Sequence, residues 1–547
     1  MGIIKDFFVY KQPKIENSNV ITENETEIKY DSRKKVKYEK KTVSNNVNSN
    51  LTVIKELFSV PKNNDVIIKE FTIKGDTKCF AIFYDGMVDS VAIDDYIIKS
   101  MLELPYVEDS EVLPLSREIR DKFIVHAQVT MTDSVETVAE DVNFGACAVF
   151  VDGVNQAFVL DVRNWEHRSI TKPENEQSIY GPQEAFGEML RTNTILIRKI
   201  LKTEKLIAEQ VKIGNVSKTR GVLLYLSDVA NSELVDNVKR RIDAISVDYI
   251  ISIEEVSHLV EDRSYIPTTQ TLLTERPDRA ARALTEGRAV LLLNGSPRAI
   301  VFPTNFYELT HAVSDAYLRA PFANMSRIVR YLGMAISMLL PGLYLAITLF
   351  HQEMLPTYLL YAISAARTNV PFPSVIELLL MDFSFEMIRE AGIRMPGPLG
   401  QTLGIVGGLI LGQSAVSAKI VSPIMIVIIA LTGIGSFATS DYSLSWSFRI
   451  LRLIYIILGA TAGFFGIAVG IFAHICYLSS IRCFGVPFLS PFPGSKNGGV
   501  FSALFVRPIW KREYRPAYLS TKNQKQESEI SRKWKQNVSR ETKRGGK

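Results

Sequence analysis

Charge is missing from long stretches of this chain. No Asp, Glu, Lys or Arg occurs in 331–352, 395–418 or 453–481. About 20 helical residues cross a 30 Å hydrocarbon core, so each stretch is long enough for a membrane span. Residues before about Arg330 are rich in charge, and those after Arg507 are strongly basic. This division excludes a wholly soluble protein and predicts a soluble part, a membrane part and a basic tail.

Residue types that carry chemistry are also scarce. The 547 residues include 4 cysteines and 6 histidines, and neither set has metal-ligand spacing or a disulfide framework. There is no Walker A loop, HExxH pair, nucleophile elbow or dinucleotide-binding glycine pattern. The formal net charge of +5 is too small to indicate nucleic acid binding. We therefore expect no enzyme, no cofactor, no metal and no nucleic acid partner.

The charged part of the chain has the pattern of an α/β domain. Residues 1–50 are polar and rich in Asn, Lys and Glu, which predicts a disordered tail. Two subdomains are expected over 51–170 and 178–318, separated by a polar gap near 166–178. The Asp152-Gly153 pair inside GACAVFVDGVNQAFVLDV predicts a tight turn between two strands. The predicted fold class is a cytoplasmic α/β domain of two subdomains followed by an α-helical transmembrane bundle.

The membrane domain is expected over 328–482, with a basic cytoplasmic tail over 483–547. Four spans are predicted, together with an acidic re-entrant or interfacial helix, and they are listed here: 331–352, 399–418, 420–440 and 453–481. Arg319, Arg327 and Arg330 place the soluble domain in the cytoplasm by the positive-inside rule. Four spans return the tail to the same side, whereas a fifth through 370–390 would expel it.

Glycines recur every fourth position in the second span. A helical turn holds 3.6 residues, so these glycines form one drifting stripe without side chains. In lipid such a stripe lets a second helix approach closely. That helix could belong to another subunit or to the same one, and both alternatives stay open. The stripe comprises Gly400, Gly404, Gly408 and Gly412, and a second small-residue series occurs at 459–470.

The acidic helix before this span carries ionisable groups at membrane depth. Glu377, Asp382 and Glu386 are expensive there unless they face a bundle interior or water. One interpretation is an ion path lined by these carboxylates. The other is a buried ion-pair network in which Glu386 and Arg389 satisfy each other.

Three stretches in this order resemble the GerA-type spore germination receptor A subunit family. They are GPQEAFGEMLRTNTILIRKILKT, TERPDRAARALTEGRAVLLLNGSP and MPGPLGQTLGIVGGLILGQSAV. The resemblance covers roughly Leu51 to Pro493. It implies a multi-pass protein of the spore inner membrane that responds to small nutrients and triggers germination. It also implies a homo-oligomer with two partners, a permease-like B subunit that binds the nutrient and a lipoprotein C subunit.

The main functional hypothesis is a nutrient-gated monovalent cation channel. The glycine stripe would pack against a neighbouring helix, and a constriction of polar and apolar groups would gate by dewetting. Acidic groups nearby would raise the local cation concentration. The predicted pore residues beyond the glycines are Gln401, Val406, Leu409, Gln413, Ser414 and Ser417. Alternatives are a non-conducting scaffold or signalling subunit, a secondary transporter, or a paralogue tied to dipicolinate release.

Overall fold

The computed structural model describes residues 42–526 with gaps at 74–75, 103–128, 164–171, 264–266, 395–407, 409, 411, 492–499, 510–511 and 513. The chain separates into two units, Met1–Lys41 and Thr42–Lys547, and only the second contains described residues. Most of the tail predicted over 1–50 lies outside them. Val43 and Val47 are buried in an apolar core, so ordered structure begins before residue 51.

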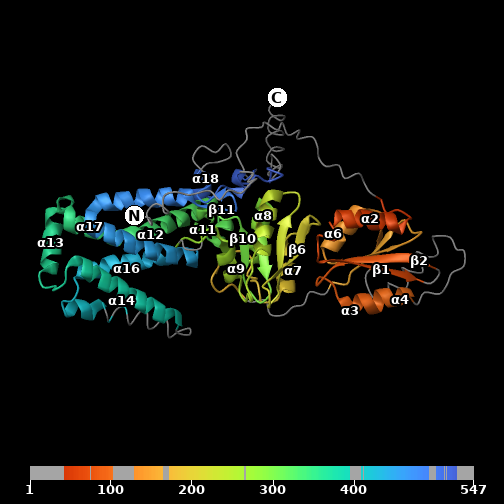
Figure 1. Ribbon diagram of the computed structural model, residues 1–547, viewed down its shortest axis with the longest axis horizontal. Coiled ribbons are helices and arrows are strands. Elements are labelled where there is room, and N and C mark those ends of the chain that lie inside the picture. Colours follow the sequence, from red (N-terminus) through yellow and green to blue (C-terminus); the bar gives the residue numbers. More distant parts are fainter. Residues whose placement is uncertain are drawn as a thin grey trace, which may run out of the picture. The chain divides into compact units, whose positions relative to one another are not determined.

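The first α/β region is a five-stranded antiparallel sheet with helices on both faces (Figure 1). Its strand order is β1-β2-β4-β5-β3. Asn46 caps the first helix by accepting hydrogen bonds from the backbone N–H groups of Asn48 and Ser49. The elements are α2 Val47–Leu57, β1 Val66–Ile73, β2 Thr77–Tyr84, α3 Ser90–Ala92, η1 Ile93–Ile98, α4 Lys99–Leu102, β3 Val129–Thr132, α6 Val135–Asn143, β4 Cys147–Val151 and β5 Ala157–Leu160.

The second α/β region repeats the first. Its strand order, β6-β7-β9-β10-β8, becomes that of the first sheet when the strands are counted from its own start. Strands β7, β9 and β10 each lie 142 positions after β2, β4 and β5. We call 42–163 repeat 1 and 188–303 repeat 2. The elements of repeat 2 are α7 Leu190–Ile200, β6 Leu206–Ile213, β7 Thr219–Leu226, α8 Ser232–Asp243, α9 Ile253–Val260, β8 Leu272–Thr274, α10 Pro277–Glu286, β9 Ala289–Leu293 and β10 Ala299–Phe302.

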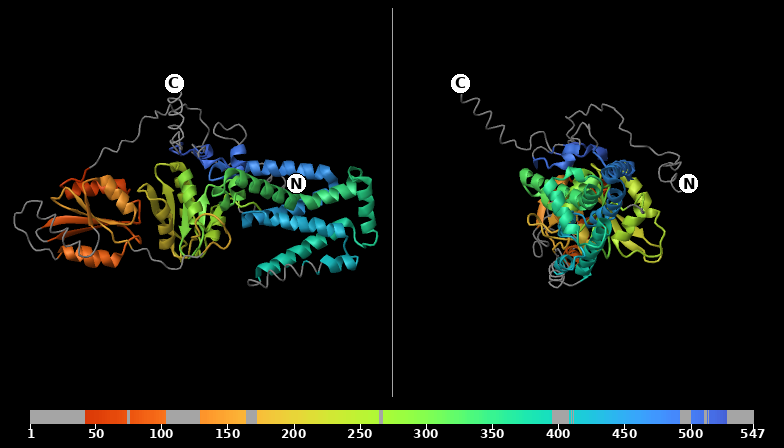
Figure 2. Two further views of the ribbon diagram at one scale, coloured as in Figure 1. Left: turned by 180° about the vertical axis from the view of Figure 1, so that it is seen from behind. Right: turned by 90° about the vertical axis from the view of Figure 1, so that its left-hand side faces the viewer.

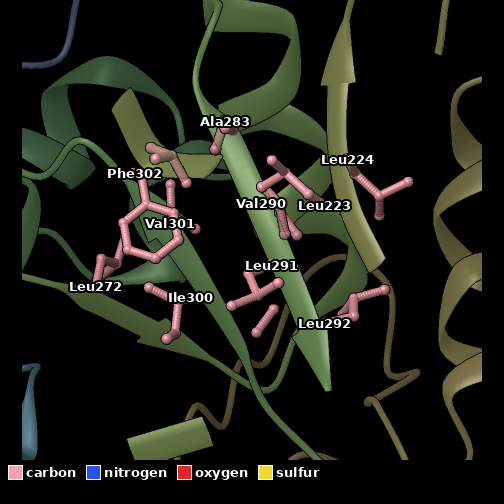
Figure 3. Packing of buried hydrophobic residues seen from close by; sticks show 14 of the residues in the cluster. Leu223, Leu224, Leu272, Ala283, Val290, Leu291, Leu292, Ile300, Val301 and Phe302 are labelled. Carbon is pink, nitrogen blue, oxygen red and sulfur yellow. The ribbon is translucent and has the colours of Figure 1, made fainter. Parts of the chain in front are cut away.

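The apolar cores of the two repeats differ in extent. Repeat 1 has a separate core on each face of its sheet. In repeat 2, Leu223, Leu291 and Val301 belong to a core whose strands are shown in Figure 3. That core continues into Met334 and Leu444 of the helices that follow. Repeat 2 is therefore built into the helical part of the protein.

The rest of the described chain is mostly helical. Helices α12, α16 and α17 pack along one another (Figure 2). Among the described residues, α12 and α17 are long and apolar enough to cross a membrane, and α16 is a shorter apolar helix. The elements are α11 Phe306–Thr310, η2 Val313–Ala316, α12 Ala320–Phe350, η3 Gln352–Met354, α13 Thr357–Arg367, α14 Ser374–Arg394, α16 Pro423–Phe437, α17 Tyr442–Ser480, β11 Arg482–Cys483, β12 Val486–Pro487, α18 Val500–Leu504 and η5 Ala517–Leu519.

Helix α17 reverses direction at Gly463, whose φ is 59° and ψ is −142°. A Cβ atom at Gly470 would lie 2.6 Å from Leu458 Cδ1. Twelve positions of a straight helix span about 18 Å, so these two residues meet only because the chain turns back. Residues 442–462 and 464–480 are thus two antiparallel arms. The single span predicted over 453–481 is corrected by this turn, which apolar composition does not reveal.

The chain after α17 returns to repeat 2. Phe484 and Phe488 are buried in its core, and the ring of Phe484 lies 4.8 Å from that of Phe302. Residues 483–490, assigned by sequence to the basic tail, are consequently part of the folded α/β region. The start of α12 and the end of α17 lie on the same side of the helical part, because Met334 and Leu478 share this core.

Candidate functional site

Five charged side chains meet between α14 and α17, and we call them the ion cluster: Asp382, Glu386, Arg389, Arg449 and Arg452. Arg449 Nη1 lies 2.7 Å from Glu386 Oε1. Arg452 Nη2 lies 3.0 Å from Asp382 Oδ1 and 3.6 Å from Glu386 Oε2. The pair expected from sequence, Arg389 and Glu386, is also present at 3.5 Å. The two arginines of α17 were not linked to this site by sequence reasoning.

Aromatic and hydroxyl groups hold the arginines in place. The guanidinium of Arg389 lies 5.1 Å from the Phe385 ring and 5.0 Å from the Phe437 ring. Its Nη2 donates a 2.6 Å hydrogen bond to Ser436 Oγ. Arg449 lies 4.2 Å from the Trp446 ring. Rings at these distances attract a cation through their quadrupole, so the arginines are positioned by α16 and α17 as well as by the carboxylates.

The cluster contains more positive than negative charge. Three guanidinium groups face two carboxylates, and all five side chains except Glu386 are at most 8% exposed. Glu386 is 30% exposed and is the open side of the cluster. Five buried nitrogen atoms of the three arginines and two buried carboxylate oxygens of the cluster make no hydrogen bond with any described residue. These atoms lie among opposite charges of the same cluster. The carboxylates are therefore neutralised within the chain, as the ion-pair interpretation expects.

Glu377 lies in a different setting on the same helix. Its Oε1 accepts hydrogen bonds from the Ser422 backbone N–H at 2.5 Å and from Ser422 Oγ at 2.6 Å. Ser422 caps α16, so this fully buried carboxylate lies at a helix N-terminus, where negative charge is favourable. The structure brings Asp382 and Glu386 together and places Glu377 with the α16 N-terminus instead.

The glycine-rich helix is described only in part. Gly400, Gly404, Val406 and Leu409, together with Gln401, lie outside the described residues. A Cβ at Gly408 would meet nothing within 4 Å, and one at Gly412 would lie 3.8 Å from Ile426. Gln413, Ser414 and Ser417 are exposed on the helical residues 412–417. Among the described residues, the stripe has no close neighbour beyond Ile426.

Close helix crossings occur mostly at glycines outside the predicted glycine series. A Cβ at Gly342 would lie 2.5 Å from the Tyr455 carbonyl oxygen, and one at Gly459 would collide with Gly342. A Cβ at Gly435 would lie 2.5 Å from the Gly333 carbonyl oxygen. Gly459 belongs to the predicted second series, whereas Gly333 and Gly342 stand nine positions apart in α12. Their isolation in the sequence explains why no periodic stripe revealed them.

The arginines used to orient the protein have a structural role at the start of α12. Asp315 Oδ2 lies 2.9 Å from Arg327 Nε and 3.0 Å from Arg330 Nη1. Burial alone would raise the pKa of Asp315, but the hydrogen bonds and charges of Arg330 and Arg327 outweigh it and lower the pKa. Arg327 and Arg330 are buried, so only Arg319 of the three is exposed.

The described part of the chain combines two tandem α/β repeats with a set of packed, largely apolar helices, and this combination is that of a membrane-associated receptor-type protein. The sequence profile of the Bacillus/Clostridium GerA spore germination proteins matches residues 52–518. The chain belongs to this family, which confirms the resemblance drawn from the three stretches.

Individual relatives agree with the family match. "Spore germination protein KA" of Bacillus subtilis is 37% identical over 463 residues, covering 84% of this chain and 85% of the relative. "Uncharacterized membrane protein YfkQ" of the same organism is 34% identical, covering 87% and 91%. The N-terminal domain of the A subunit of the Bacillus megaterium spore germinant receptor GerK3 is 27% identical, covering 48% of this chain and 95% of that domain, with a TM-score of 0.37.

Proposed function

We propose that the chain is the A subunit of a spore germinant receptor. The observation that carries this proposal is the family match over 52–518. The expected partners are a permease-like B subunit, which would bind the nutrient, and a lipoprotein C subunit. A binding and signalling role is favoured over an enzymatic one, since the buried charges of the helical part neutralise one another instead of presenting a reactive group.

The proposed location is the spore inner membrane, with the α/β repeats in the cytoplasm. One relative is itself named a membrane protein, and α12 and both arms of α17 are apolar. Met334 and Leu478 share one core, so an even number of crossings lies between them. Helices α14 and α16 run in the same direction, because Glu377 meets Ser422 and Arg389 meets Ser436. We propose six crossings, of which α12, α14, α16 and the two arms of α17 supply five, and the sixth is expected in chain that lies mostly outside the described residues.

Cysteine labelling tests the six-crossing topology. In a background with Cys476→Ala, Thr461→Cys lies next to the Gly463 turn and Ser479→Cys lies near the end of the second arm. A membrane-impermeant maleimide should label Thr461→Cys only from outside and Ser479→Cys only from the cytoplasmic side. Labelling of both positions from the same side would contradict the reversal across the membrane.

The proposed activity is nutrient-gated conduction of monovalent cations by a homo-oligomer. Gly408 is exposed, and no described residue lies within 4 Å of a Cβ placed there, which leaves room for a helix of another copy. Close approach at a small residue favours helix association in lipid. The adjoining Gln413, Ser414 and Ser417 would then face the pore, with Val406 and Leu409 at the constriction.

Reconstitution of the receptor with its B and C subunits in liposomes tests this activity. Nutrient should release trapped monovalent cations, and Gly408→Leu should reduce that release at least tenfold by wedging the copies apart. Ala418→Leu adds the same side chain at an exposed turn position and serves as the matched control. Bridges between copies with Gly408→Cys would support the oligomer, whereas normal release by Gly408→Leu would overturn the close-packing arrangement.

A non-conducting scaffold is the second candidate. It is favoured by the ion cluster, in which the arginines neutralise Asp382 and Glu386 instead of leaving them to attract cations. A scaffold would show no nutrient-dependent cation release in the same liposomes, while spores lacking the chain would still fail to germinate. That pair of results separates the two candidates.

A further inference from the structure

After its first contact with repeat 2 at 483–490, the chain passes along the start of α12 and then meets repeat 2 a second time. Asn324 and Val506 exchange two hydrogen bonds, of 3.3 Å from Asn324 Nδ2 and 2.6 Å to Asn324 Oδ1. Arg327 Nη1 donates to the carbonyl oxygens of Ala503 and Leu504 at 3.2 and 3.3 Å. Helix α18 is thereby fixed to the first three turns of α12.

Further along the chain, residues 514–526 lie on repeat 2, and we call them the strap. Arg515 Nε donates a 2.7 Å hydrogen bond to the Thr285 carbonyl oxygen at the end of α10. The Lys522 backbone N–H donates to the Val229 carbonyl oxygen at 3.0 Å. Arg288 Nη2 donates to Tyr518 Oη at 3.0 Å. Leu519, 2% exposed, is the large apolar side chain that the strap buries.

Repeat 1 uses the corresponding surface to contact repeat 2. Asn143 and Asp85 of repeat 1 correspond to Thr285 and Ser227 of repeat 2, each 142 positions later. Asn143 Nδ2 donates to Glu204 Oε2 at 3.2 Å, and Arg191 Nη2 lies 2.8 Å from Asp85 Oδ1. In repeat 2 the same surface receives the strap, where Lys522 Nζ donates to the Ser227 carbonyl oxygen at 3.0 Å. This surface is therefore covered by repeat 2 in repeat 1, and by the strap in repeat 2.

We propose that the strap is a detachable latch that couples repeat 2 to the first turns of α12. Its contacts are mainly hydrogen bonds to backbone carbonyl oxygens, and contacts of this polar kind separate more readily than an apolar core. The latch lies apart from the core that joins repeat 2 to the helices. Detachment therefore frees α18 and the start of α12 without unfolding repeat 2. This regulatory role goes beyond conduction and does not depend on it.

Hydrogen exchange on the full chain in lipid nanodiscs tests the latch. Leu519→Glu places a charge in the buried contact and should detach the strap. Gln526→Glu makes the same kind of substitution at an exposed position and is the control. We expect amide exchange in 500–506 and 320–331 to rise at least tenfold in Leu519→Glu and to stay unchanged in the control. Exchange within β7 and β9 should not change in either variant.

Truncation supplies an independent version of the same test. A chain ending at Arg512 lacks the strap, and a chain ending at Gln526 keeps it. If exchange in 320–331 is unchanged when the strap is removed, the coupling is overturned, whatever the conduction experiment shows. If it rises only in the shorter chain, the latch is supported even for a non-conducting protein. Nutrient response of spores carrying the two truncations then reports whether the latch regulates germination.

Discussion

The two α/β repeats have the same strand order but pack against different parts of the protein. In repeat 1 the Gly153 N–H donates to the Asn45 carbonyl oxygen, and the Val47 N–H donates to Asp152 Oδ1 at 2.9 Å. In repeat 2 the Gly295 N–H donates to the Glu188 carbonyl oxygen, and the Leu190 N–H donates to Asn294 Oδ1 at 3.3 Å. In both repeats the turn between the fourth and fifth strands therefore fixes the N-terminus of the repeat's first helix, α2 or α7. This detail indicates that the repeats share more than strand order.

Their differences concentrate in buried arginines. Positions 134, 137 and 146 of repeat 1 are Ser, Thr and Ala, and the corresponding residues of repeat 2 are Arg276, Arg279 and Arg288. Arg276, with no exposed surface, donates to the Pro182 carbonyl oxygen at 2.7 Å. Arg288, 1% exposed, lies 3.1 Å from Glu308 and binds the strap. Repeat 2 thus uses charge to dock neighbouring segments, whereas repeat 1 has small or polar side chains at the same places.

The largest expected effect comes from removing one of these arginines. Arg288→Ala leaves the Glu308 carboxylate, 27% exposed, and the buried Pro303 carbonyl oxygen without their Arg288 partner, and should lower the free energy of unfolding of repeat 2 by about 3–5 kcal/mol. Denaturant unfolding of the purified protein in detergent measures it. Arg282→Ala is the control, because Arg282 is 45% exposed and should cost less than about 1 kcal/mol. Equal losses in the two variants would refute the docking role of the buried arginines.

Low pH should destabilise the region around Glu308, where His311 is buried. Burial lowers the pKa of His311 to about 3, below its usual 6.5, although Glu308 opposes that shift. The unfolded chain then binds the proton more readily, so stability is full above pH 6.5 and falls as the pH drops from 6.5 towards 3. A loss of a few kcal/mol follows from a shift of this size.

His311→Gln tests that assignment. The variant should flatten the pH dependence of unfolding between pH 6.5 and 3, with hydrogen exchange in 303–316 as the local readout. His311 Nε2 lies 2.9 Å from the Ala503 carbonyl oxygen, so the neutral ring donates there and Gln can do the same. His258→Gln is the control at an exposed helix position. An unchanged pH dependence of unfolding in His311→Gln would show that His311 does not cause the loss of stability in acid.

Sequence reasoning predicted the parts of the fold that depend on local pattern. The Asp152-Gly153 turn, the α/β class and the apolar helices follow from strand periodicity, turn chemistry and charge-free runs. The repeat itself was missed, because the corresponding strands share apolar character more than identical residues. Its signal is nevertheless present in the matching runs GACAVFVDG and GRAVLLLNG.

Only the α14 residues of the ion cluster could be predicted from the sequence. Asp382, Glu386 and Arg389 share a helical face by spacing, so their proximity could be expected. Arg449 and Arg452 lie some 60 positions later, and only the packing of α14, α16 and α17 brings them to the carboxylates. The Gly463 reversal was hidden for a similar reason. Glycine fits both a helix packed in lipid and a turn with positive φ, and tertiary contacts decide between them.

Breaking the contact between the repeats should cost less free energy than removing Arg288 from repeat 2. Arg198, 3% exposed, donates to Asp65 Oδ1 at 2.7 Å and to the Leu206 carbonyl oxygen at 3.1 Å. Arg198→Ala should separate repeat 1 from repeat 2 at a cost of about 2–3 kcal/mol while each sheet stays folded. Exchange at 63–65 and 206–210 measures the separation. Arg191→Ala, at an ion pair whose partners are both over 40% exposed, should have an effect below about 1 kcal/mol.

The smallest effect tests whether the two turns are equivalent. Gly153 has φ of 83° and Gly295 has φ of 84°, values that disfavour an L side chain. A Cβ at Gly153 meets nothing within 4 Å, and one at Gly295 meets only the Ile251 carbonyl oxygen at 4.0 Å. Backbone strain is then the main cost of Gly→Ala, about 1–2 kcal/mol at each position. Gly153→Ala and Gly295→Ala should therefore destabilise their own repeats equally, as measured by exchange of β4 and β9. A loss in one repeat more than twice that in the other would mean that the turns hold their helices with different strength, and the repeats would then differ in architecture as well as in attachment.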